Sequence, residues 1–262
     1  MKSILRRIGK ILARHLSRPT AHGVRVATSP PEKLKATLKK GDVLLVEGSS
    51  RFSLAIKYLT QSTWSHSALY IGDAVDSLDK GEATRSIVEA DIQDGIRLMP
   101  LSIYYYRHTR ICRPVGLTSD QIDKLIAFAV SREGDQYDLK NIFDLARYLI
   151  QRPPVPSHWR RRLLSIGSGD PTRAICSSLI AQAFHSVGYP ILPEIVSYIS
   201  GDPDKPTVQE EYAHIRHHSL FSPSDFDLSP YFDIIKPTVE HGFDPGLINW
   251  RDTDAMIADN KA

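Results

Sequence analysis

Cys176 carries the strongest chemical signal in the chain. Residues 174–187 have apolar side chains at helical spacing, so Cys176 is expected in the first turn of a helix. There the backbone N–H groups and the helix dipole favour an anion, and they lower the pKa of a thiol so that the nucleophilic thiolate forms at neutral pH. The small neighbours Ala174, Ser177 and Ser178 leave room for a substrate. Free cysteine is also among the most buried residue types, so its position alone leaves a packing role open.

His66 is the candidate base for this thiol. It opens the apolar segment 67–71, which is expected to form a strand and so to hold the imidazole rigidly. A histidine base needs its second ring nitrogen held by a carboxylate or an amide. Glu89, inside the apolar segment 86–90, is the candidate for this role because a buried carboxylate requires a partner. The alternative is that Glu89 faces solvent on an edge strand.

No metal or other cofactor is expected. The 2 cysteines, Cys112 and Cys176, are 64 residues apart and form no C-x-x-C motif, so a zinc site is rejected. The remaining histidines lie in polar settings that are typical of a solvated surface. Two cysteines are also too few for a secreted disulfide scaffold, which favours a reducing, cytoplasmic compartment.

The elements that must position these side chains are strands followed by helices. Short connections between the expected strands indicate an antiparallel meander, because parallel strands need long crossovers. Thr118 and Gln121 fit a capping box that opens a helix, and Gly134 is expected to end it. The sequence after residue 203 is expected to be irregular apart from a last strand at 231–236. The predicted strands are 43–46, 67–71, 86–90, 95–99 (after a turn at Asp94-Gly95) and 109–114, and further helices are predicted at 52–59, 142–150 and 174–187.

Charge is distributed unevenly along the chain. The 262 residues carry a net charge of +3, but residues 1–40 hold 11 Lys and Arg against one acidic residue, which leaves the rest mildly acidic. Residues 1–16 alternate apolar and basic side chains at helical spacing, and residues 20–40 are expected to be a linker. The interpretation stays open between a helix that binds an anionic membrane surface and a segment that packs on the protein's own body or forms a frayed basic tail.

Several motifs together resemble one known family, the permuted papain-like amidases of the YiiX/YaeF group, a branch of the NlpC-type cysteine hydrolase superfamily. They are Gly41-Asp42-Val43, the segment 64–72 around His66, Glu89, the segment 134–138 around Tyr137, and the segment 174–180 around Cys176. In this group the histidine strand precedes the cysteine helix, as it does here. The resemblance covers about residues 40–237. It divides the chain into an arm and linker (1–40), a hydrolase domain (41–237) and a tail (238–262).

The resemblance implies an α+β fold, a circularly permuted papain-like (NlpC-type) antiparallel sheet packed on helices. It implies Cys176 as nucleophile, His66 as base, Glu89 as the residue that orients the base, and Tyr137 as a substrate contact. The reaction would be cleavage of an amide or ester bond through a thiol acyl-enzyme, by hydrolysis or acyl transfer. Peptide-like, cell-wall-derived and lipid-derived substrates all remain open.

Two other classes of function are kept as alternatives. One is a non-catalytic member of the same fold that binds a ligand at a membrane surface. The other is a nucleic-acid-binding protein that uses the basic arm, and the acidic body argues against it. We therefore expect a cytoplasmic enzyme without a nucleic-acid partner, with peripheral membrane association through residues 1–40 left open.

Overall fold

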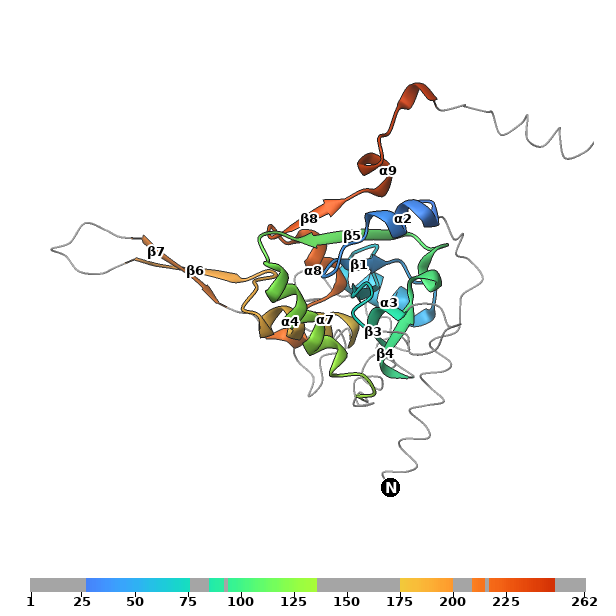
Figure 1. Ribbon diagram of the computed structural model, residues 1–262. Coiled ribbons are helices and arrows are strands. Elements are labelled where there is room, and N and C mark those ends of the chain that lie inside the picture. Colours follow the sequence, from blue (N-terminus) through green and yellow to red (C-terminus); the bar gives the residue numbers. More distant parts are fainter. Residues whose placement is uncertain are drawn as a thin grey trace, which may run out of the picture.

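A six-stranded antiparallel sheet forms the centre of the protein (Figure 1). The computed structural model describes residues 27–75, 85–91, 94–135, 175–199, 209–214 and 217–247. The predicted meander is confirmed, because most strands pair with their neighbours in sequence. The strand order is β4 (Gly95–Pro100), β3 (Arg85–Asp91), β2 (His66–Tyr70), β1 (Val43–Val46), β5 (Thr109–Pro114) and β8 (Phe232–Ile235).

Both faces of this sheet are covered, which explains why its central strand is apolar at every position. Val43 and Leu45 of β1 point into one hydrophobic cluster, and Leu44 and Val46 point into a second cluster on the other face. The first cluster includes side chains of α4 (Ser119–Val130), α7 (Ile175–Ser186) and α8 (Pro223–Leu228). The second includes side chains of α2 (Pro31–Thr37) and of the 3-10 helix η1 (Leu101–Tyr104).

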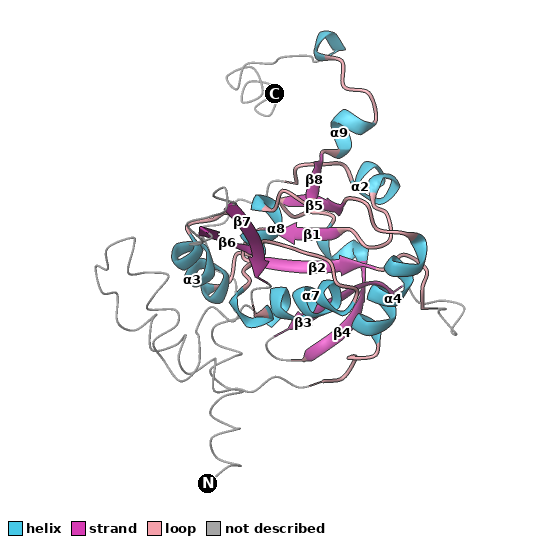
Figure 2. Ribbon diagram, turned by 90° about the vertical axis from the view of Figure 1, so that its left-hand side faces the viewer, coloured by secondary structure: helices cyan, strands magenta, loops and turns pink. Residues whose placement is uncertain are grey.

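Helix α7, which carries Cys176, packs with α4 on the face of the sheet to which Val43 and Leu45 point. The capping box of Thr118 and Gln121 is present at the start of α4, which ends at Val130; Gly134 (φ +86°) comes in the turn that follows. α7 contacts α4, β2 and β3, and it ends before Gly188, whose φ of +70° suits a residue without a side chain. Figure 2 shows α7 beside the strands that it covers.

Three parts of the chain differ from the expectation. The range expected to be a linker contains α2, which starts at a proline and buries Leu34. The range expected to be irregular contains α8, whose capping box joins Ser222 and Asp225. It also contains β7 (Gln209–His214), which pairs with β6 (Glu194–Ile199) in a hairpin that extends away from the sheet in Figure 1. The expected tail begins with α9 (Pro237–Glu240), and His241 directly after it contacts Thr37 of α2.

The other predicted elements agree or lie outside the described residues. The helix predicted at 52–59 is α3 (Arg51–Thr60), and Ser50 caps its first turn. The amphipathic segment 1–16, the helix predicted at 142–150 and Tyr137 lie outside the described residues. Within the described ranges, no helix is both long and apolar enough to cross a membrane.

Candidate active site

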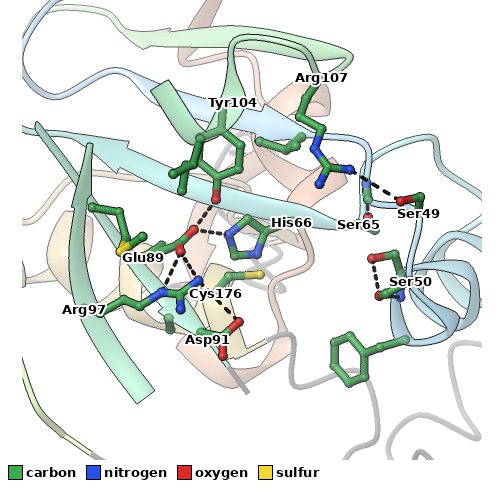
Figure 3. Close-up of a pocket in the computed structure, with 17 residues that line it drawn as sticks. Ser49, Ser50, Ser65, His66, Glu89, Asp91, Arg97, Tyr104, Arg107 and Cys176 are labelled. Carbon is green, nitrogen blue, oxygen red and sulfur yellow. Dashed lines mark hydrogen bonds and ion pairs between the residues drawn. The ribbon is translucent and has the colours of Figure 1, made fainter. Parts of the chain in front are cut away.

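Cys176 and His66 meet where α7 packs on β2. Cys176 is the second residue of α7, and His66 is the first residue of β2, the strand beneath it. The thiol and the imidazole lie close enough to shift each other's pKa. Figure 3 shows the Cys176 side chain next to the His66 ring, with Glu89 directed at the same ring. The fold therefore joins two residues that are 110 positions apart in the sequence.

Glu89 holds the other side of the imidazole. His66 Nε2 lies 2.7 Å from Glu89 Oε2, and it must be the donor because an ionised carboxylate only accepts. The ring nitrogen Nδ1 is then left for the thiol. β3 lies between β4 and β2 in the sheet, and Glu89 is only 2% exposed, so the alternative of a solvent-facing edge position does not hold.

Two further residues bind Glu89. Arg97 lies opposite Glu89 in the β3–β4 register, and its Nε and Nη2 are 2.9 and 2.7 Å from Oε1. The Tyr104 hydroxyl donates to Oε2, the oxygen that also accepts from His66. Both carboxylate oxygens thus have two donors each.

The electrostatics of this group favour a thiolate–imidazolium pair. Burial by itself would raise the pKa of Cys176, but the charge and hydrogen bond of His66, together with Ser67, outweigh it and lower that pKa. Burial would lower the pKa of His66, but Cys176 and Glu89 raise it well above its ordinary value. Burial would raise the pKa of Glu89, yet His66, Tyr104 and Arg97 lower it to about 2. A thiolate of this kind is a nucleophile at neutral pH.

An aromatic anchor fixes the segment that leads into β2. Trp64 is 3% exposed, and its indole Nε1 donates to Asp227 Oδ2 of α8 at 2.9 Å. Arg110 of β5 binds the same carboxylate at 2.7 Å, and its guanidinium lies 5.0 Å from the centre of the Trp64 ring. Because Trp64 is two residues before His66, these contacts restrict where the imidazole can lie.

A cavity of about 350 Å³ adjoins Cys176 and His66. Gly48 lies on its wall and donates its backbone N–H to Ser65 Oγ at 2.9 Å. A Cβ at Gly48 would come within 2.1 Å of Ser53 Oγ, so the close approach of this segment to α3 requires glycine. The lining is mixed, with the hydroxyls of Ser49, Ser50, Ser53 and Ser65, the apolar side chains of Val46, Phe52, Ala90, Met99 and Ile103, and the charged side chains of Asp91, Arg97 and Arg107.

The environment of Cys112, the other cysteine, differs from that of Cys176. Cys112 is fully buried in β5, and burial together with the Asp227 carboxylate raises its pKa. The two cysteines therefore differ in the ease with which they ionise, although both are free thiols. Among the described residues, no three His, Cys, Asp or Glu side chains are grouped so that they could hold a metal ion.

Of the four residues proposed from the sequence, the structure brings together Cys176, His66 and Glu89, while Tyr137 lies outside the described residues. Sequence reasoning missed Arg97 and Tyr104. The predicted turn at Asp94-Gly95 would set Glu89 opposite Pro100, whereas the structure pairs Asp91 with Gly95 and therefore Glu89 with Arg97. Tyr104 is one of three consecutive tyrosines, 104–106, and no pattern distinguishes it from the others.

Comparison with known proteins agrees with the family suggested by the motifs. Residues 37–148 match the sequence model of the permuted papain-like amidase enzymes, the YaeF/YiiX (C92) family. This range includes His66 and Glu89, and Cys176 lies beyond it. The match and the antiparallel sheet with its packed helices confirm the family resemblance and the α+β permuted papain-like fold class.

Two individual proteins are also similar to this chain, both at low sequence identity. The probable lipoprotein peptidase YaeF of Escherichia coli (strain K12) is 24% identical over 193 residues, which represent 68% of this chain and 64% of YaeF. The chain therefore spans less than two thirds of that relative's length. The crystal structure of the metalloprotein yiiX from Escherichia coli O157:H7 aligns with a TM-score of 0.44 and 16% identity, over 75% of this chain and 96% of the other.

Proposed function

Since residues 37–148 carry the sequence signature of the permuted papain-like amidases, we propose that this protein is a cysteine-dependent hydrolase that cleaves an amide or ester bond. The observation that carries the proposal is the continuous chain of contacts from the Cys176 thiol through His66 to Glu89. A nucleophile hydrogen-bonded to a base, with the base held by a third group, is the arrangement that activates a thiol.

The reaction would proceed in two steps. The Cys176 thiolate attacks the carbonyl carbon, and the electron pair of the C=O bond moves onto oxygen. When the tetrahedral species collapses, the leaving nitrogen or oxygen takes the proton from His66, and a thioester to Cys176 remains. His66 then takes a proton from water, whose oxygen attacks the thioester. The acid product leaves, and the proton held by His66 restores the thiolate–imidazolium pair.

The cavity supports a substrate with a small acyl group next to the scissile bond. A volume of about 350 Å³ lies at the lower end of the range for small-molecule sites. The apolar side chains and hydroxyls of its lining suit an aliphatic chain that carries an amide or a hydroxyl, and Asp91 and Arg107 add charge beside the polar groups of such a substrate. The name of the YaeF relative, a probable lipoprotein peptidase, favours peptide-like substrates over cell-wall-derived and lipid-derived ones.

Pre-steady-state kinetics with 4-nitrophenyl acetate test the proposal. An acyl-enzyme mechanism predicts an initial burst of about one 4-nitrophenolate per protein, followed by slower steady turnover. A non-catalytic ligand-binding protein would give neither phase above the rate of the buffer. That outcome would replace the enzyme proposal with the binding alternative.

We also propose that residues 1–16 bind anionic membranes as an interfacial helix, on the basis of their apolar and basic periodicity. Each basic side chain near an anionic surface contributes about 1 kcal/mol, and salt screens this attraction. The cytoplasmic location expected from the two cysteines fits this proposal, because the inner leaflet is anionic.

Co-sedimentation with phosphatidylglycerol vesicles is expected to separate the full chain from a variant that lacks residues 1–26. This deletion stops before α2, which packs on the body, so the fold should be retained. Equal sedimentation of the two proteins would refute the membrane proposal. Charge and apolar contacts should both matter, so either of two sets of changes should release the full chain: Arg6, Arg7, Lys10 and Arg14 to Glu, or Ile8 and Leu12 to Asp.

A further inference from the structure

The Glu89 carboxylate is bound from three different elements. Among the described residues, Oε1 accepts from Arg97 of β4, and Oε2 accepts from His66 of β2 and from Tyr104 of η1. On the far side of His66, the Cys176 thiol of α7 faces the imidazole. Asp91 and Arg107 line the same cavity as His66 and Glu89. Asp91 Oδ2 lies 3.6 Å from Arg97 Nη2, the atom that also binds Glu89, and Asp94 binds Arg97 Nη1.

Tyr104 makes two contacts with this group. Its hydroxyl donates to Glu89, and its ring lies 6.1 Å from the centre of the His66 ring. The residue is 8% exposed, and Leu101 of the same 3-10 helix packs with it in the second hydrophobic cluster. The hydroxyl is therefore held at the carboxylate by a packed element, and Figure 3 shows it pointing at Glu89.

Because His66 and Tyr104 both donate to Glu89 Oε2, each of these two hydrogen bonds weakens the other. A carboxylate oxygen that accepts two hydrogen bonds is a weaker acceptor for each of them than an oxygen that accepts one. The Tyr104 hydroxyl thus reduces the pull of Glu89 on the His66 proton. His66 needs a proton affinity high enough to keep the thiolate paired and low enough to release the proton to a leaving group.

We propose that Tyr104 is a positioning residue that limits the basicity of Glu89 and thereby keeps the His66 imidazolium acidic enough to protonate the leaving group. This inference rests on the proposed function, because it assigns a purpose to the proton of His66. Arg97 acts differently, since it binds the oxygen that His66 does not use and holds the carboxylate in place.

The pH dependence of Cys176 alkylation by iodoacetamide tests this proposal without a known substrate. A paired thiolate reacts at low pH, and its rate rises again when the neighbouring imidazolium loses its proton, so the upper inflection reports the pKa of His66. Removing the phenol leaves Glu89 more basic, which stabilises the imidazolium. Tyr104→Phe should therefore move the upper inflection to higher pH by about one unit, while Tyr105→Phe, a neighbouring tyrosine with no contact to Glu89, should leave it unchanged.

Replacing Tyr104 by 3-fluorotyrosine gives the opposite test, because its more acidic hydroxyl is a stronger donor. The upper inflection should then move to lower pH, and this variant decides the matter if Tyr104→Phe does not fold. An inflection that stays in place or moves the same way in both variants would overturn the inference. Failure of the proposed function would look different, since wild-type Cys176 would then react no faster than Cys112 and show no second inflection.

Discussion

Replacing Cys176 by alanine is expected to abolish hydrolysis of 4-nitrophenyl acetate, with a loss of at least about 1,000-fold. The thiolate supplies the bond-forming electron pair, and no other described side chain in the cavity is a thiol. The smaller residue fits α7 because alanine is the best helix former. Steady-state kinetics measure the loss, and circular dichroism checks the fold.

Cys112→Ala is the matched control for this change. Cys112 is buried in β5, away from the cavity lining, so its replacement should reduce stability and leave most of the activity. Equal inactivation by the two substitutions would assign both cysteines a structural role. It would remove the basis for calling Cys176 a nucleophile.

His66→Ala is expected to reduce the same activity by about 100- to 10,000-fold. Without the imidazole, burial dominates at Cys176, so the pKa of the thiol rises and little thiolate remains at neutral pH. The remaining rate should therefore increase steadily with pH, whereas the wild type should already be active in acid solution. A pH–rate profile for both proteins measures this difference.

Glu89→Gln provides the graded comparison for His66→Ala. The amide oxygen still accepts from His66 Nε2, but it lacks the charge that stabilises the imidazolium. The loss of activity in Glu89→Gln should therefore be smaller than the loss in His66→Ala. A silent Glu89→Gln would show that another group orients the imidazole.

Much of the sheet could be predicted because each central strand is a short apolar run between polar turns. β1 buries all four of its side chains since both faces of the sheet are covered, and this makes the run continuous. β7 and α8 could not be predicted in the same way. β7 belongs to a hairpin that pairs only with itself among the described strands, and α8 has six residues, too few for a periodic pattern.

Three residues of the candidate site could be predicted because their type and local sequence indicate their chemical role. Cys176 at a helix start and His66 at a strand start are recognisable from local sequence, and Glu89 stands out as a carboxylate in an apolar strand. Tyr104 was not predictable because its role depends on the turn of η1 and on burial, which no residue in its neighbourhood specifies. The contact between α7 and β2 likewise arises only from packing at long range.

Identification of the acylated residue is the sharpest test of Cys176 as the nucleophile. Wild-type protein is mixed with 4-nitrophenyl acetate, quenched in acid within the burst, digested and analysed by mass spectrometry. If Cys176 is the nucleophile, it should carry an acetyl group that is absent from Cys112 and that disappears as turnover ends. An acetyl group on another residue, or equal labelling of the two cysteines, would contradict the assignment of Cys176 as the nucleophile.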